Sequence, residues 1–142
     1  MRKRPIILVV EEDADTAEAL RQILPRWGFD VRSAANLADA RSAVAAGPFD
    51  LLLSDLVLPD GNGADLCREL QLDHHVPAIA VTGYSAPDDT ARSKSAGFDR
   101  SLQKPFDMDL LFCAIQKTLG KKCGADGGEE TPEAGRMPGK LL

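Results

Sequence analysis

The chain has 142 residues, of which 44% are hydrophobic, and this length predicts one domain with a single buried core. Its 17 Lys and Arg and 22 Asp and Glu residues give a formal net charge of −5, which argues against direct binding to nucleic acid. No apolar run approaches the roughly 18 residues that span a membrane, and the run at residues 5–10 is too short for a signal peptide, so we expect a cytoplasmic protein without membrane contact.

Short aliphatic or β-branched runs alternate along the chain with stretches of helical spacing. The runs that predict strands lie at residues 6–10, 30–33, 51–54, 78–81 and 100–103. The apolar residues at helical spacing are Ala17, Leu20, Leu24 and Trp27; Leu37, Ala40 and Val44; Leu66 and Leu70; and Leu111, Ile115 and Leu119. Another helix, at about residues 87–96, is the weakest because its apolar residues are all small.

Glycine and proline residues lie at positions that agree with the ends of the predicted helices. Gly28, Gly47 and Gly97 lie where the first, second and fourth helices should end. Pro25 lies near the end of the first helix, where it should kink or shorten the last turn.

Five successive β–α units predict an α/β fold, a doubly wound parallel sheet of five strands covered by helices on both faces. We expect this domain to occupy residues 1–120. Residues 121–142 contain five Gly, two Pro and no aromatic residue, a composition that predicts a disordered tail or linker. The cysteines Cys67, Cys113 and Cys123 fit neither a disulfide framework nor a zinc site, and we expect three buried or inert thiols.

The residues that could take part in chemistry lie where the predicted strands end. Glu11 and Glu12 follow the first strand, Asp55 the third, Thr82 the fourth and Lys104 the fifth. The carboxyl ends of parallel strands form one edge of the sheet, so these groups should converge. Crowded carboxylates call for a cation such as Mg²⁺, and a carboxylate beside a cation, a hydroxyl and a lysine can receive a phosphoryl group. The sequence therefore suggests that Asp55 accepts phosphate.

Four strings of the chain resemble the receiver domain of two-component response regulators. They are ILVVEED at residues 7–13, FDLLLSDLVLPDGNG at 49–63, VTGYS at 81–85 and GFDRSLQKPF at 97–106. The resemblance covers about residues 5–119. It implies a flavodoxin-like sheet with strand order 2-1-3-4-5 and a signalling phosphoacceptor rather than an enzyme.

The resemblance also implies the ligands of a metal and the source of the phosphoryl group. Asp55 would take that group from a phosphohistidine on a sensor histidine kinase or a histidine phosphotransfer protein. Glu11 and Glu12 would hold Mg²⁺ together with Asp55 and the backbone carbonyl of Val57.

Further roles follow from the same resemblance. Thr82 would be the switch hydroxyl, Lys104 would pair with the phosphate, and Pro105 is its expected neighbour. Val57 and Tyr84 would occupy variable positions that influence how fast the aspartyl phosphate hydrolyses. The signal would pass to a downstream partner or output domain, since no DNA-binding domain follows in this sequence.

Two residues depart from the family pattern. Glu12 stands where the family usually has Asp, which puts the geometry of a Mg²⁺ site in question. An alternative register, with Glu12 and Asp13 as the acidic pair, needs a bulge in the first strand. Ser101 stands where an aromatic residue is frequent, so a switch that rotates an aromatic ring is not expected.

Several other interpretations stay open. The chain could be a pseudo-receiver, a protein-binding module that keeps the fold without phosphate chemistry. Asp55 could be only a turn residue, and the acidic residues 11–13 could only favour the start of a helix. A hydrolase is disfavoured because Val57 replaces a second acid, and a flavin or nucleotide binder because no Gly-rich loop follows the first strand. We expect His74 and His75 to be exposed to solvent.

Overall fold

A computed structural model of the chain describes residues 4–72, 75–83 and 94–120. Its five-stranded parallel sheet has the order β2-β1-β3-β6-β7. The strands are β1 (Ile6–Val10), β2 (Asp30–Ala34), β3 (Leu51–Asp55), β6 (Ala78–Thr82) and β7 (Arg100–Gln103). In strand rank this is 2-1-3-4-5, so the predicted fold class and strand order are confirmed.

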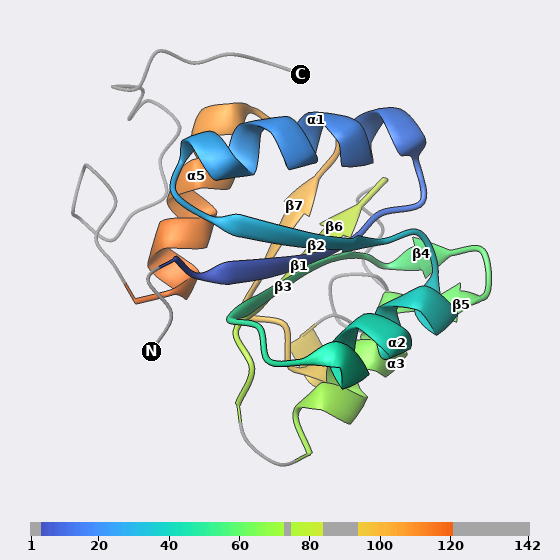
Figure 1. The fold of residues 1–142 in the computed structure, drawn as a ribbon. Coiled ribbons are helices and arrows are strands. Elements are labelled where there is room, and N and C mark those ends of the chain that lie inside the picture. The colour runs from blue at the N-terminus through green and yellow to red at the C-terminus, as the bar shows by residue number, and fades with distance from the viewer. Residues whose placement is uncertain (1–3, 73–74, 84–93, 121–142) are drawn as a thin grey trace.

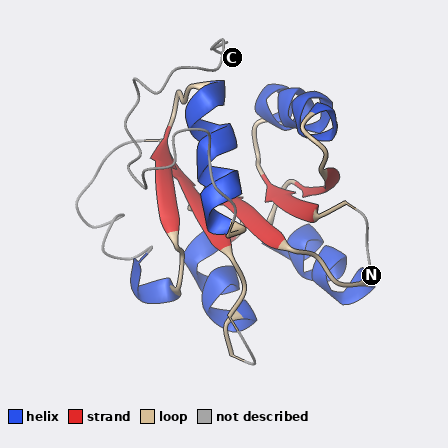
Figure 2. Cartoon of the chain, turned by 90° about the vertical axis from the view of Figure 1, so that its left-hand side faces the viewer, coloured by secondary structure: helices blue, strands red, loops and turns tan. Residues whose placement is uncertain are grey.

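Four helices flank the sheet within the described residues, two on each face (Figures 1 and 2). They are α1 (Ala14–Arg26), α2 (Leu37–Ala46), α3 (Gly63–Leu70) and α5 (Met108–Thr118). Figure 1 shows α1 and α5 on one face and α2 and α3 on the other. Most of the predicted fourth helix lies outside the described residues, although residues 94–96 are helical.

The alternation of side chains along β1 explains why both faces need cover. Ile7 and Val9 pack in a cluster with residues of α1 and α5, whereas Leu8 and Val10 pack in a second cluster with residues of α2 and α3. All four are at most 1% exposed. Successive strand residues point to opposite faces, so a continuous apolar run can serve two helical layers.

The helix ends follow local chemistry that the sequence displays. Asp13 caps α1 by accepting a hydrogen bond from the backbone N–H of Thr16 at 2.9 Å. Pro25 is the last residue but one of α1, and the helix ends one residue later. Gly28 then turns the chain into β2 with a φ of +97°, a conformation that glycine adopts at little cost.

A two-stranded antiparallel hairpin that the sequence analysis did not predict follows the central strand directly. It pairs β4 (Val57–Leu58) with β5 (Gly61–Asn62), and Figure 1 shows it beside the start of α2. Residues 59 and 60 form its turn. The Asp-Gly pair at positions 60 and 61 is a known hairpin signal and could have revealed it.

The cysteine prediction is correct only in part. Cys67 is free and buried. Cys113 on α5 is disulfide-bonded, so the prediction of an inert thiol is wrong there, because cysteine spacing alone does not fix which sulfurs meet in the fold. Cys123 lies outside the described residues, as does the whole predicted tail.

Candidate functional site

Glu11 and Asp55 come together because their strands are neighbours in the sheet. Val10 pairs with Ser54 at the ends of β1 and β3, so the residues that follow emerge side by side. Their side chains point into the protein, since Glu11 is 4% and Asp55 7% exposed. Two buried carboxylates at one sheet edge repel each other and need positive charge nearby.

Lys104 supplies that charge from the loop after β7. Its Nζ lies 2.8 Å from Glu11 Oε2 and 3.4 Å from Asp55 Oδ1. The backbone fixes this approach, because the N–H of Lys104 donates to the carbonyl of Thr82 at 2.8 Å. The peptide bond between Lys104 and Pro105 is cis. The ammonium group therefore bridges both carboxylates.

Thr82 ends β6, the strand between the acceptor and the lysine. It pairs with Gln103 of β7 and is 9% exposed. The neighbouring residue Val81 pairs with Asp55 and accepts a hydrogen bond from the N–H of Leu56 at 3.0 Å. The register of β3, β6 and β7 thus places Thr82 at the same sheet edge as Asp55 and Lys104.

The electrostatics of Asp55 show that one lysine does not neutralise the pair. Burial, together with a hydrogen bond and charge repulsion from Glu11, raises the pKa of Asp55 to about 7. Lys104 and the N–H of Glu12 act in the opposite direction but do not cancel the rise. Burial lowers the pKa of Lys104, but its hydrogen bond to Glu11 and the charges of both carboxylates raise it overall. The site therefore disfavours two ionised carboxylates at neutral pH.

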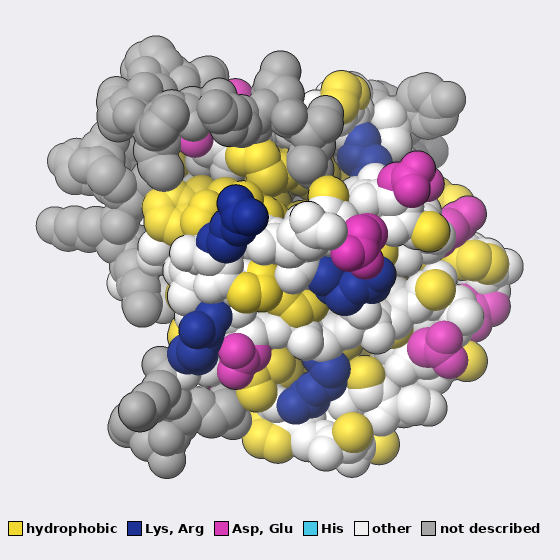
Figure 3. Space-filling view, turned by 45° about the horizontal axis from the view of Figure 1, so that its top comes forward, with side chains coloured by type: hydrophobic (Ala, Val, Ile, Leu, Met, Phe, Trp, Pro, Cys, Tyr) yellow, Lys and Arg dark blue, Asp and Glu magenta, His cyan; other side chains and the backbone are white. Residues whose placement is uncertain are grey.

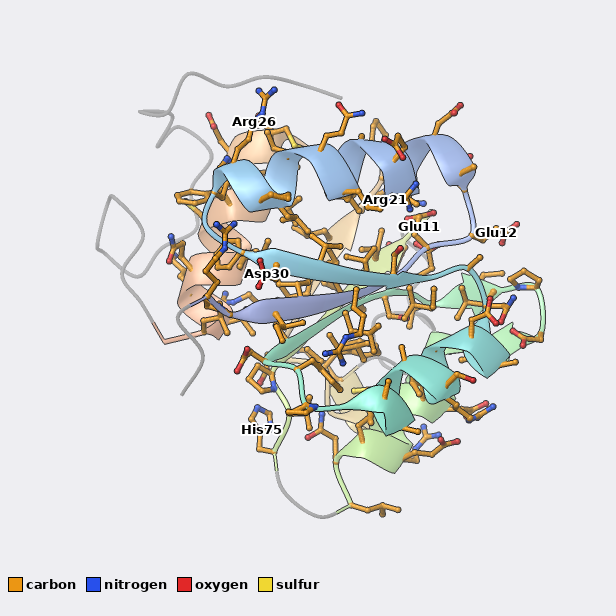
Figure 4. The ribbon with its side chains drawn as sticks, in the orientation of Figure 1. Glu11, Glu12, Arg21, Arg26, Asp30 and His75 are labelled. Carbon is orange, nitrogen blue, oxygen red and sulfur yellow. The ribbon has the colours of Figure 1, made fainter. Side chains whose placement is uncertain are left out.

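Glu12 lies differently from Glu11. Its side chain is exposed and points away from the body of the protein (Figure 4). Only its backbone takes part in the site, where its N–H donates to Asp55 Oδ2 at 3.2 Å. Among the residues that the structure describes, no group of three or more His, Cys, Asp or Glu side chains is gathered to hold a metal.

The alternative register of the acidic pair has no support in the sheet. β1 pairs residue by residue with β2 from Ile6 to Val10, and the ladder contains no bulge. Asp13 instead caps α1, as noted above, and its N–H donates to Glu11 Oε2 at 3.0 Å. The interpretation of residues 11–13 as a helix start therefore holds for Asp13, while Glu11 belongs to the site.

The chain folds tightly behind the acceptor. The N–H of Gly63 donates to the carbonyl of Leu56 at 2.7 Å. A Cβ on Gly63 would lie 2.1 Å from the backbone oxygen of Asp55, closer than any side chain permits. Gly63 is the last residue of the family-like string at residues 49–63, but the string alone does not reveal this contact, which follows from the hairpin of residues 57–62.

This arrangement can do one kind of chemistry well. A buried carboxylate has an ammonium group 3.4 Å away and a hydroxyl-bearing residue on the next strand. Such a set can bind and neutralise a small tetrahedral anion attached to the carboxylate.

The model of one protein family matches most of the chain. The family is described as the response regulator receiver domain, and the match covers residues 7–116. The chain belongs to this family. It is a receiver domain of two-component signal transduction, and such domains are signalling modules rather than enzymes in the usual sense.

Curated relatives agree with this assignment. The chain is 35% identical over 134 residues to the response regulator protein PilR of Pseudomonas aeruginosa, covering 94% of this chain and 30% of PilR. It is 37% identical over 119 residues to the DNA-binding response regulator MtrA of Mycobacterium tuberculosis, covering 84% of this chain and 51% of MtrA. The chain thus spans 30% of the length of PilR and about half of the length of MtrA.

Solved structures share the fold. A CheY-like receiver domain from Methanospirillum hungatei has a TM-score of 0.78 at 30% identity, with 82% of this chain and 94% of that chain covered. The receiver domain of a signal transduction histidine kinase from Syntrophus aciditrophicus has a TM-score of 0.74 at 31% identity, with 89% and 96% covered.

The remaining sequence expectations have mixed outcomes. Ser101 is exposed on β7. His75 is exposed, as predicted, and its Nε2 lies 3.2 Å from Asp99 Oδ1. His74 and Tyr84 lie outside the described residues.

The surface of the receiver domain on the side of α1 carries both signs of charge. Figure 3 shows Lys and Arg side chains interspersed with Asp and Glu and with hydrophobic side chains there, without a continuous basic area. No helix in the described part of the chain is both long and apolar enough to cross a membrane.

Proposed function

We propose that this receiver domain accepts a phosphoryl group on Asp55. The observation that carries the proposal is the contact of Asp55 with Lys104 at 3.4 Å, inside a site where Glu11 is the only other buried acid among the described residues. A carboxylate oxygen of Asp55 attacks phosphorus while the bond from phosphorus to the donor breaks. The donor keeps that electron pair and takes a proton, and the product is a mixed anhydride.

Lys104 and Thr82 have distinct parts in this proposal. The ammonium group of Lys104 already lies near Asp55 and would move its charge from Glu11 to the new phosphoryl oxygens. Thr82 would offer its hydroxyl as a hydrogen-bond donor to the same group, and its movement would carry the signal into the loop that follows β6. The two residues are linked through their backbones, because the N–H of Lys104 donates to the carbonyl of Thr82.

The reaction is proposed to need Mg²⁺, and the donor groups present fit this ion. Mg²⁺ is commonly held by one or two carboxylates and several waters. Glu11 and Asp55 supply two buried carboxylates, and burial together with the hydrogen bond and the charge of Glu11 raises the pKa of Asp55, so the site favours a further cation. The backbone carbonyl of Val57 and, after rotation, the carboxylate of Glu12 would complete the set. When bound, the ion would neutralise charge on the phosphoryl oxygens.

The phosphoryl donor is proposed to be a phosphohistidine of a sensor histidine kinase or a histidine phosphotransfer protein. A downstream protein or an output domain would read the altered surface. MtrA is described as DNA-binding, but the chain covers only 51% of it, so that property is not transferred to this domain.

A pseudo-receiver remains a second candidate because of one observation. The carboxylate of Glu12 points outward, so the acidic pair of the family is not assembled in the described residues. The two candidates differ in a Mg²⁺ titration followed by backbone amide shifts of residues 11–13 and 55. Shifts at millimolar metal support the phosphoacceptor, and their absence supports the pseudo-receiver.

The direct test uses intact-mass spectrometry after treatment with a small phosphodonor, with and without Mg²⁺. We expect the wild type to gain one phosphoryl group only when Mg²⁺ is present, and Asp55→Asn to gain none. The matched control is Asp15→Asn, which removes an exposed carboxylate from the first turn of α1 and should be labelled like the wild type. Labelling of Asp55→Asn would refute the assigned acceptor.

A further inference from the structure

Asp60 joins the segment behind the phosphoacceptor to a helix on the α2–α3 face of the sheet. It lies in the turn of the β4–β5 hairpin, and its two carboxylate oxygens accept from the first two residues of α2. The N–H of Leu37 lies 2.8 Å from Oδ1, and the N–H of Ala38 lies 3.1 Å from Oδ2. Figure 1 shows the hairpin beside this end of α2.

These contacts complete the hydrogen bonding at the start of α2. The first N–H groups of a helix have no partner within it. Asn36 accepts from the N–H of Asp39 at 2.8 Å, and its carbonyl accepts from Ala40 at 3.0 Å, where the helical ladder begins. The two N–H groups that Asn36 does not reach are those of Leu37 and Ala38, so Asp60 is the second cap of this helix. These hydrogen bonds lower the pKa of Asp60 and keep it charged.

A second observation shows how closely the hairpin lies on α2. Gly61 has a φ of +150°, and a Cβ there would come within 2.6 Å of Leu37 Cδ1. Leu37 and Leu58 belong to the same buried cluster. The hairpin is therefore held on α2 by packing as well as by the Asp60 carboxylate.

The other end of the hairpin meets the acceptor itself. Gly63 approaches the backbone oxygen of Asp55 so closely that no side chain fits between them, and its N–H donates to Leu56. The segment from Asp55 to Gly63 is thus fixed at one end by β3 and at its tip by α2. A shift of the tip would move Val57 and the backbone beside Asp55.

We propose that Asp60 is a positioning residue for the phosphoacceptor. By holding the hairpin tip on the N-terminus of α2, it keeps Asp55 and the carbonyl of Val57 in the geometry that phosphoryl transfer needs. This inference rests on the proposed function of Asp55. It assigns to α2 a part in the site, although α2 contributes no side chain there.

The test compares Asp60→Ala with Asp39→Ala, two variants of the full chain that each remove one exposed carboxylate near the start of α2. Only Asp60 bonds to Leu37 and Ala38. Initial rates of labelling by a small phosphodonor at saturating Mg²⁺ are measured by intact mass, and amide hydrogen exchange reports the N–H groups of residues 37 and 38.

We expect Asp60→Ala to label about tenfold more slowly, in line with the cost of a small misplacement of reacting groups. Amide exchange at residues 37 and 38 should rise in the same variant. Asp39→Ala should label like the wild type, and Asp60→Asn, which keeps one acceptor oxygen, should recover part of the rate.

Two results would overturn the inference. One is an Asp60→Ala variant that labels at the wild-type rate while its amides exchange faster, and the other is an equal loss of rate in Asp39→Ala. If the wild type itself is not labelled, the proposed function fails instead, so the two failures are distinguishable. A thermal melt of each variant shows whether a slow rate reflects an unfolded protein, in which case Asp60→Asn at a lower temperature decides.

Discussion

Replacing Asp55 by Asn should stabilise the metal-free protein at neutral pH, although it removes the acceptor. Asp55 carries its charge in a buried position beside Glu11, which raises its pKa from an ordinary 3.8 to about 7. At about 1.36 kcal/mol for each tenfold change in proton affinity, holding this charge costs the native state about 4 kcal/mol. Asparagine has the same shape without the charge and avoids this cost.

The sign of the pH dependence follows from proton binding. Between about pH 4 and pH 7 the native wild type holds a proton on Asp55 that the unfolded chain has lost, so its stability falls as the pH rises through this range. Near pH 4 Asp55 is neutral in the native state and the advantage of Asn disappears. The advantage should therefore grow from near zero at pH 4 to about 4 kcal/mol at pH 8.

Urea denaturation at pH 4, 6 and 8 measures the difference in stability between Asp55→Asn and the wild type. It is carried out in the presence of a metal chelator and followed by the fluorescence of Trp27. Trp27 is the single tryptophan of the chain and packs edge-on against Phe112 with ring centroids 4.9 Å apart, so unfolding should change its emission. Asp15→Asn controls for the loss of one negative charge at an exposed position. A difference between Asp55→Asn and wild type that stays constant with pH, or a less stable variant at pH 8, would refute the electrostatic reasoning.

Two further predictions concern the neighbours of Asp55. Lys104→Met removes the cation that bridges Glu11 and Asp55, so the pKa of Asp55 should rise above about 7. Urea denaturation at pH 7 should show a free energy of unfolding lower by about 2 kcal/mol, a smaller loss than for a fully buried ion pair, and an unchanged stability would contradict this prediction. Gly63→Ala would place a Cβ 2.1 Å from the backbone oxygen of Asp55 and should lower the free energy of unfolding by about 3 kcal/mol in the same assay. The control Gly83→Ala, where a Cβ has open space, should lower it far less, and equal losses would show that the contact does not constrain the backbone.

The architecture was predictable because its determinants are local. Continuous apolar runs such as residues 7–10 specify buried parallel strands. The stretches of helical spacing between the runs, which end near Gly28 and Gly47, specify the helices that connect the strands. The convergence of Glu11, Asp55 and Lys104 then follows from topology, since the ends of neighbouring parallel strands share one edge.

The details that the sequence did not reveal depend on contacts that only the folded chain creates. Nothing in the sequence fixes that the Glu11 carboxylate turns inward to Lys104 while that of Glu12 turns outward, because adjacent acidic residues look alike before the backbone direction is known. The cap that Asp60 places on α2 likewise joins residues whose proximity only the fold creates. The β4–β5 hairpin was also not predicted, but its Asp-Gly signal was visible in the sequence.

The most direct test of the central claim locates the phosphoryl group itself. Wild-type protein labelled by a small phosphodonor in Mg²⁺ is treated with borohydride, which reduces an aspartyl phosphate to homoserine, and the digest is sequenced by tandem mass spectrometry. We predict homoserine at position 55 and at no other aspartate. Homoserine at a different position, or labelled protein that keeps Asp55 intact, would contradict it.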